Sequence, residues 1–173
     1  SYTCVNGGMV IAVADDPGMH SSQNEQDSRH YAIAAKVPML EPADSAETKD
    51  YVKLAYEISE KFDTPVIVRM CTRIAHSQSI VEAEDRIEKE LPAYEKNGAK
   101  YIMMPGNAIK RHPFVEQRTL DLTEFAETDE INKVESGNGD LTFGIITSGT
   151  CYQYVKEIFG DSVPVLKLGM VNP

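Results

Sequence analysis

The 173-residue sequence predicts an α/β fold built on a parallel sheet. Two short apolar runs without alternation, Met9–Ala14 and Pro65–Cys71, are typical of strands buried on both faces, as in parallel sheets. A helix-compatible stretch, an extended segment and an amphipathic stretch lie between them. Strands and helices that alternate in this way favour right-handed crossovers that place helices against the sheet.

The amphipathic stretch before the second strand carries clear helix signals. Asp44 and Glu47 resemble a capping box, with Asp44 as the cap. Apolar residues then fall on one broad face as far as Phe62. An earlier helix is expected within Asn24–Lys36, where apolar residues also follow a helical pattern.

The middle of the chain carries weaker signals, mostly from proline and glycine. In chain order, the predictions are a helix-prone stretch at Ser79–Asn97 that Pro92 interrupts and Gly98 stops, a strand at Lys100–Met104, a helix over about Phe114–Glu127 with Pro113 in its first turn, and a polar linker over Thr128–Asp140. We expect the linker to mark a domain boundary.

The last part of the chain predicts one βαβ unit of a second domain. Its strands are expected at Leu141–Thr147 and Val163–Leu168, with a helix at Tyr152–Phe159 between them. The turn Ser148–Thr150 precedes that helix and can bind phosphate, although such turns are more often purely structural. Because the chain starts close to one strand and ends just past another, we expect it to be a piece of a longer polypeptide.

Composition excludes several classes of function. A net charge of −10 and a pI near 4.8 argue against nonspecific nucleic-acid binding. No apolar run approaches the ~20 residues of a membrane span, so no membrane contact is expected. The three cysteines are widely spaced and form no metal or redox motif, which fits a reducing cytoplasm.

The loop after the first strand is the main candidate site. Ligands of open parallel sheets bind outside the carboxyl ends of the strands, and this loop is densely polar. Its candidate residues are Asp16, His20, Ser21, Ser22, Gln23 and Arg29. A plain turn followed by serine helix caps explains the same pattern equally well.

A small positive cluster follows the second strand. Arg69, Arg73 and His76 stand at its carboxyl end in an otherwise acidic chain. They are candidates for anion contacts, but ion pairs with nearby acids are the more frequent explanation of such a cluster.

Four segments carry a family resemblance, in order and over nearly the whole chain. ADDPGMHSSQNEQDSR, PVIVRMCTRIAHSQS, GIITSGTCYQYVKE and VLKLGMVNP resemble the alpha subunits of the indolepyruvate:ferredoxin oxidoreductase family, which belongs to the thiamine-diphosphate-dependent 2-oxoacid:ferredoxin oxidoreductases. The resemblance implies an incomplete, pyrimidine-domain-like fold over residues 1–118 with a family-specific extension. It also implies a helix and linker over 119–140 and the start of a transketolase C-terminal-like domain over 141–173.

The resemblance implies oxidative decarboxylation of an arylpyruvate such as indolepyruvate. Electrons would pass through iron–sulfur clusters to ferredoxin, and coenzyme A would take the acyl group. Thiamine diphosphate and magnesium would belong to the parent enzyme, an oligomer that includes a beta subunit. In the related beta chains of 2-oxoacid dehydrogenases, a His-Ser-Gln histidine faces the cofactor and substrate. This implies a catalytic role for His20, with one serine inserted after it, and places Asp16, Ser21, Ser22, Gln23 and Arg29 nearby.

Features that the family needs elsewhere are absent from this sequence. There is no Gly-Asp-Gly motif followed at a distance by Asn for magnesium and diphosphate, and no cysteine-rich ferredoxin motif. We therefore expect the chain alone to be inactive and to hold neither magnesium nor a cluster. The alternatives are the same chemistry on pyruvate, a branched-chain oxoacid or 2-oxoglutarate, or a noncatalytic module that docks a partner subunit.

Overall fold

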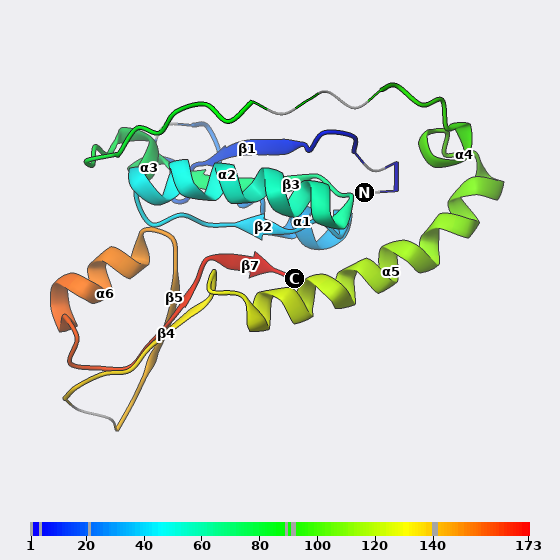
Figure 1. The fold of residues 1–173 in the computed structure, drawn as a ribbon. Helices are drawn as coiled ribbons and strands as arrows, with labels where there is room; N and C mark the ends of the chain where they lie inside the picture. The colour runs from blue at the N-terminus through cyan, green and yellow to red at the C-terminus, as the bar shows by residue number, and fades with distance from the viewer. Residues whose placement is uncertain (1, 4, 21, 89, 91–92, 140–141) are drawn as a thin grey trace.

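The structure is a computed structural model that describes residues 2–3, 5–20, 22–88, 90, 93–139 and 142–173. Its elements are β1 (Val10–Asp15), α1 (Arg29–Ala35), β2 (Met39–Leu40), α2 (Ser45–Phe62), β3 (Val66–Cys71), α3 (Thr72–His76), α4 (Gly98–Tyr101), α5 (Pro105–Thr128), β4 (Lys133–Glu135), β5 (Ile145–Ser148), α6 (Cys151–Phe159), β6 (Val165–Leu168) and β7 (Met170–Asn172). Figure 1 shows these elements as two units, a larger one around β1–β3 and a smaller one with α6.

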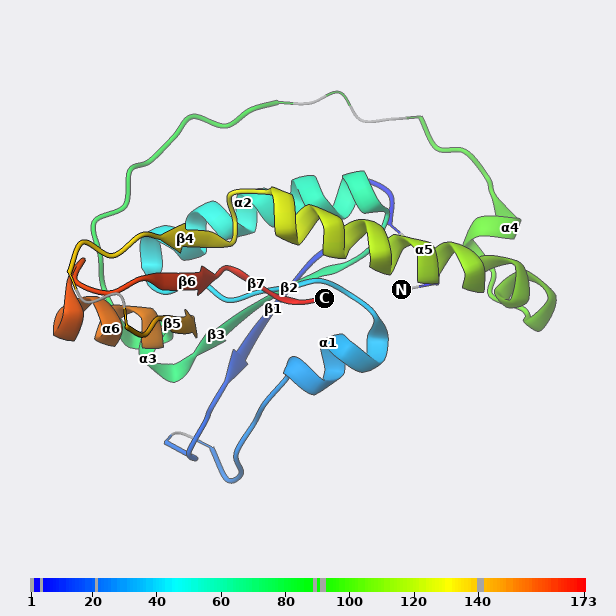
Figure 2. The same ribbon diagram turned by 90° about the horizontal axis from the view of Figure 1, so that it is seen from below.

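The larger unit is an α/β sheet with the strand order β1-β3-β2-β7. β1, β3 and β2 run parallel, and β7 pairs antiparallel with β2. Helices α2 and α5 lie on one side of this sheet, and α1 lies on the other (Figure 2). The α/β class with a parallel sheet, predicted from the sequence, is confirmed.

The central strand β3 is buried on both faces because its side chains alternate between two cores. Val66 and Val68 pack into the cluster that α2 and α5 cover, and Ile58 of α2 belongs to the same cluster. Ile67 packs on the opposite face, in the cluster that contains Ala32 of α1. The apolar run Pro65–Cys71 therefore predicted its strand correctly.

The first apolar run forms a strand, but its predicted burial on both faces is wrong. In the described part of the chain, β1 is the edge of the sheet and pairs with β3 alone. Met9 is 48% exposed and Ile11 is 41% exposed. An unbroken apolar run identifies a strand without specifying how many neighbours the strand has, so the sequence could not place β1 at the edge.

Helix α2 matches its prediction at both ends. The Asp44 carboxylate accepts a hydrogen bond from the Glu47 backbone N–H at 2.9 Å. Glu47 in turn accepts from the backbone N–H of Ala43 at 2.8 Å, one residue before the cap, so the arrangement is a variant of the capping box. The helix ends at Phe62, and Asp63 follows in the left-handed conformation with φ of 53°.

Four predictions for the middle of the chain are wrong, although the helix expected over about Phe114–Glu127 is present as part of α5. The described residues between 77 and 97 form neither helix nor strand and are exposed, because their charges leave no apolar face to bury. Gly98 begins α4 instead of ending a helix, and α4 occupies part of the predicted strand Lys100–Met104. Helix α5 begins at Pro105, in the first turn, and continues through Pro113.

The smaller unit is a sheet with the order β4-β6-β5. β5 and β6 run parallel with α6 between them, so the predicted βαβ unit is confirmed. The linker prediction is wrong in part, because β4 lies within Thr128–Asp140 and pairs with β6. After β6 the chain returns to the larger sheet as β7. None of the helices in the described ranges is long and apolar enough to cross a membrane.

Candidate functional site

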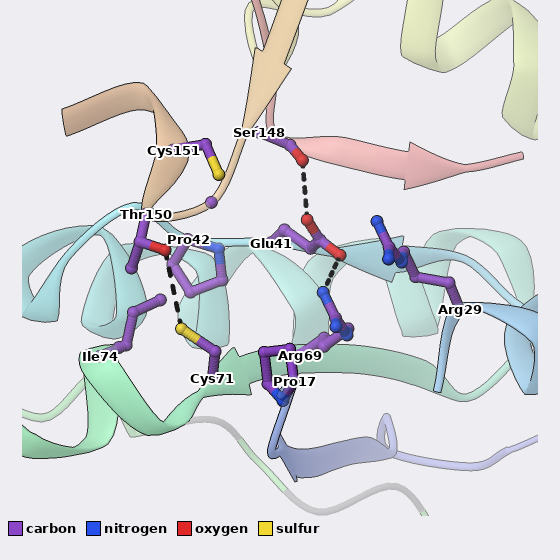
Figure 3. Close-up of a pocket in the computed structure, with 11 residues that line it drawn as sticks. Pro17, Arg29, Glu41, Pro42, Arg69, Cys71, Ile74, Ser148, Thr150 and Cys151 are labelled. Atoms are coloured by element: carbon purple, nitrogen blue, oxygen red, sulfur yellow. Dashed lines mark hydrogen bonds and ion pairs between the residues drawn. The ribbon is translucent and has the colours of Figure 1, made fainter. Parts of the chain in front are cut away.

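A cavity of about 200 Å³ lies where the two units meet (Figure 3). It is bounded by the carboxyl ends of β1, β2 and β3 and by the turn between β5 and α6. The lining residues are Pro17, Arg29, Glu41, Pro42, Arg69, Cys71, Ile74, Ser148, Gly149, Thr150 and Cys151. The cavity therefore occupies the edge at which parallel sheets commonly bind ligands.

A buried ionic network forms the floor of the cavity. Arg69 of β3 is only 9% exposed and forms an ion pair with Asp15 at the end of β1. Its Nη1 atom donates to Glu41 Oε1 at 2.6 Å. Glu41 Oε2 accepts from Ser148 Oγ at 2.8 Å, so the network reaches from the larger unit to the smaller one (Figure 3).

Asp15 fixes the end of the loop that follows β1. Its carboxylate accepts from the Ser28 backbone N–H at 2.7 Å and from the Ser28 hydroxyl at 2.6 Å. Burial opposes ionisation of Asp15, but the hydrogen bonds from Ser28 and Arg69 outweigh it and lower the pKa of this carboxyl below its ordinary value. Asp15 is therefore a charged acid that closes the loop at its base.

Asp16 organises the tip of the same loop. Its carboxylate accepts from the backbone N–H groups of His20 at 3.1 Å and Ser22 at 2.7 Å. It also accepts from the hydroxyls of Ser22 at 2.8 Å and Thr72 at 2.7 Å. The predicted site residues Asp16, His20 and Ser22 are thus brought together, with the Asp16 carboxylate turned toward the loop itself.

The other predicted residues of this loop have varied surroundings. His20 and Gln23 are exposed, and neither lines the cavity. Arg29 lines the cavity and donates to Asp27 at 2.7 and 2.8 Å. That hydrogen bond lowers the pKa of the Asp27 carboxyl. Ser21 lies outside the described residues.

The predicted serine cap of the first helix is wrong for Ser22. Its hydroxyl binds Asp16, and the cap position of α1 belongs to Ser28.

The positive cluster after β3 is only partly assembled. Arg69 lines the cavity and pairs there with buried acids. Ion pairs with nearby acids were the more frequent explanation expected for this cluster. The Arg73 guanidinium lies 5.7 Å from the ring centroid of Tyr154, outside the cavity lining. His76 is exposed at the end of α3 and is also absent from the lining.

Glu41 was not predicted as a site residue, although its place in an apolar stretch of the sequence indicated a buried acid. Glu41 is the one charged residue in the run Val37–Pro42, and it is only 4% exposed. A lone acid among buried residues indicates a paired acid, because an unpaired buried carboxylate is very costly. Cys71 and Cys151 also line the cavity, and no spacing motif marked them.

The residues of the cavity can be compared with what the metal and cofactors implied by the resemblance require. Among the described residues, no group of three or more His, Cys, Asp or Glu side chains could hold a metal ion. The cavity of about 200 Å³ is also below the roughly 300–1,000 Å³ of typical cofactor pockets. In the part of the chain that the structure describes, this cavity therefore fits neither a metal centre nor a complete cofactor site.

Comparison with curated proteins finds relatives that share one name and align with the whole chain. The indolepyruvate oxidoreductase subunits IorA of Archaeoglobus fulgidus and Methanothermobacter marburgensis are 40% and 42% identical to it over 178 residues. The IorA subunit of Pyrococcus horikoshii is 40% identical over 183 residues. The chain spans 28–29% of the length of these three relatives. No family model matches the chain.

A solved structure shares the fold. The 2-oxoglutarate:ferredoxin oxidoreductase from Magnetococcus marinus, with 2-oxoglutarate, coenzyme A and succinyl-CoA bound, aligns with a TM-score of 0.56. The alignment covers 95% of this chain and 37% of that chain, at 15% sequence identity. The α/β arrangement described above is therefore shared with part of that solved structure.

Proposed function

Because the chain is related over its whole length to the indolepyruvate oxidoreductase subunits IorA, we propose that it forms part of the alpha subunit of a 2-oxoacid:ferredoxin oxidoreductase. The whole enzyme would oxidatively decarboxylate an arylpyruvate, with indolepyruvate as the substrate. The observation that carries this proposal is 40–42% identity over the full chain to three such subunits. The chain would supply one wall of the active site.

The loop after β1 is the part of the chain that we assign to this wall. Pro17 of the loop and Arg29, the first residue of α1, line the cavity, so the loop borders the edge of the sheet where ligands usually bind. His20 would act there as the catalytic histidine, by donating a proton or a hydrogen bond to substrate. Arg69 is less suited to a direct ligand contact, because two buried acids already occupy its guanidinium.

The remaining chemistry would come from outside the 173 residues. Thiamine diphosphate, magnesium and iron–sulfur clusters would be held by other parts of the enzyme, including the beta subunit. Ferredoxin would take the electrons and coenzyme A the acyl group. We place the enzyme in the cytoplasm, where the free thiols of Cys71 and Cys151 would stay reduced. The division of the chain at residues 118 and 140 stays a prediction.

The test is reduction of a low-potential dye by the whole enzyme with thiamine diphosphate, magnesium and coenzyme A. We expect indolepyruvate to support reduction far better than pyruvate or 2-oxoglutarate. Reduction with another 2-oxoacid alone would keep the reaction and reject the substrate. No reduction with any 2-oxoacid, in a preparation with intact clusters, would favour a noncatalytic docking module.

The role of His20 has its own test in the same assay. His20→Ala should lower kcat by about 100-fold or more if the imidazole transfers a proton. The exposed position of His20 makes a large loss of stability unexpected. Wild-type turnover in this variant would remove His20 from the catalytic machinery while leaving the enzyme class unchanged.

A further inference from the structure

The loop that carries His20 is held in a strained backbone conformation. Gly18 has φ of 76°, and the next residue, Met19, has φ of 56° without being a glycine. A side chain in the left-handed region is sterically disfavoured, so the surrounding contacts must hold Met19 there. The His20 ring lies close to Gly18. A Cβ atom added at Gly18 would be 3.7 Å from His20 Nε2.

The contacts that hold this conformation converge on Asp16. The backbone carbonyl of Asp16 accepts from the Met19 N–H at 3.2 Å. Its side chain accepts from the N–H groups of two residues that follow Met19, His20 and Ser22. Asp16 is 5% exposed, so these hydrogen bonds are shielded from water and are correspondingly strong.

The same carboxylate ties the loop to a neighbouring strand. Thr72, which directly follows β3, donates its hydroxyl to Asp16 Oδ1 at 2.7 Å. β1 and β3 are paired in register from Val10 and Val66 to Asp15 and Cys71. The loop is therefore anchored on two adjacent strands of the sheet, which is a rigid support for a catalytic side chain.

We propose that Asp16 is the positioning residue of the active site: its buried carboxylate holds the strained tip of the loop and thereby sets the place of the His20 imidazole. This inference rests on the proposed function for its catalytic consequence. It changes the sequence-based assignment, in which Asp16 was a residue beside substrate or cofactor. Among the described residues, its carboxylate accepts hydrogen bonds from His20, Ser22 and Thr72, so it is turned toward the loop and the end of β3.

The informative variant is Asp16→Asn in the whole enzyme. It keeps the side-chain size but replaces one acceptor oxygen with an NH₂ group, which cannot accept from the donors of the loop. We expect kcat with indolepyruvate to fall about 10- to 100-fold, as for a misplaced catalytic group, with a smaller change in KM. Thr72→Val should lower kcat less than Asp16→Asn does. Thr72→Ser keeps the hydroxyl and should retain the wild-type kcat.

The matched control is Glu25→Gln, which removes one carboxylate charge from the same loop at an exposed position. It should leave kcat unchanged. A fall of kcat equal to that of Asp16→Asn would overturn the proposal, because loss of charge alone would then explain the effect.

Two further measurements separate positioning from general damage. In a His20→Gln background, Asp16→Asn should cause no additional loss of kcat, because its effect passes through His20. Hydrogen–deuterium exchange should become faster at the amides of His20 and Ser22 in Asp16→Asn. Unchanged exchange at both amides would overturn the proposal whatever happens to turnover. Faster exchange together with a fully active His20→Gln enzyme would instead reject the catalytic role of His20.

Discussion

At the scale of single residues, the cavity depends on charges that are buried and paired. Arg69 is held between Asp15 and Glu41, and it is the one charged residue of β3, whose other residues are Val66, Ile67, Val68, Met70 and Cys71. Removing one member of such a group leaves the others buried without compensation, which costs more than a surface pair of the same kind. The network therefore makes stability depend on the ionisation of its acids.

Asp15 provides a pH prediction. Hydrogen bonds to Ser28 and Arg69 lower its folded-state pKa below the ordinary value. The charged form therefore contributes stability that is fully present above the ordinary pKa of about 4 and is lost as the pH falls below it. Asp15→Asn should destabilise the enzyme by about 2 kcal/mol at pH 7. The difference in apparent Tm between wild type and variant should shrink as the pH drops below about 4.

The control for this titration is Asp50→Asn. Asp50 is an exposed acid on α2, so its loss should change the apparent Tm little at any pH. A difference between wild type and Asp15→Asn that stays constant down to pH 3 would contradict the assignment of the acid-sensitive contribution to Asp15.

At the scale of elements, the correct predictions are those in which the sequence pattern matches what the core requires. α2 was predicted by its caps and by its apolar face together, and both are present in the structure. β3 was predicted by an apolar run that its two cores require. For α5, the start predicted at Pro113 is wrong, because Pro105 occupies the first turn of the helix. The apolar contacts of Leu122 and Ala126 stabilise the long helix despite the internal proline.

Replacing Pro113 or Pro105 by alanine should therefore change the stability of α5 in opposite directions. Pro113→Ala restores a backbone donor in the helix interior and should stabilise α5 by about 1–2 kcal/mol after the entropy of the unfolded chain is counted. Pro105 occupies the first turn, where its ring is favourable, so Pro105→Ala should destabilise by about 0.5 kcal/mol. Apparent Tm values of the whole enzyme measure both. A lower Tm for Pro113→Ala than for wild type would show that the internal proline serves the helix.

The candidate site was predictable only in part, for a related reason. The polar loop after β1 was located from the rule about strand ends, and its hydrogen bonds to Asp15 and Asp16 are local. The opposite wall comes from Glu41 and Ser148, which are 107 residues apart. No local pattern encodes a contact over that distance, because it depends on how the smaller unit packs on the larger one.

At the scale of the whole molecule, three acids join the two units. Each binds its own unit with one carboxylate oxygen and the smaller unit with the other. The contacts to the smaller unit run from Glu41 to Ser148, from Asp44 to Gln153 and from Glu47 to Lys167. The contacts within the larger unit run from the same acids to Arg69, to the Glu47 N–H and to the Ala43 N–H. Two of these acids, the cap residue Asp44 and Glu47 in the first turn of α2, therefore also hold the smaller unit on the larger one.

Lys167 is the most buried partner across this junction and gives a prediction at this scale. Its side chain is 5% exposed, against 24% for Glu47. Lys167→Met should destabilise docking of the smaller unit by about 3 kcal/mol, the low end for a broken buried pair, because Glu47 keeps some access to water. The measurements are the apparent Tm of the whole enzyme and hydrogen–deuterium exchange in β7, which lies beside the junction.

Lys156→Met is the matched control for that variant. Lys156 forms its ion pairs with Glu135 and Asp161, inside the smaller unit, and is 26% exposed. Its loss should change the apparent Tm little and leave exchange in β7 unchanged. Adding Glu47→Gln to Lys167→Met should recover part of the lost stability, since no buried charge then remains unpaired. If Lys167→Met is as stable as wild type, the junction is held by packing and the acids at the start of α2 serve that helix alone.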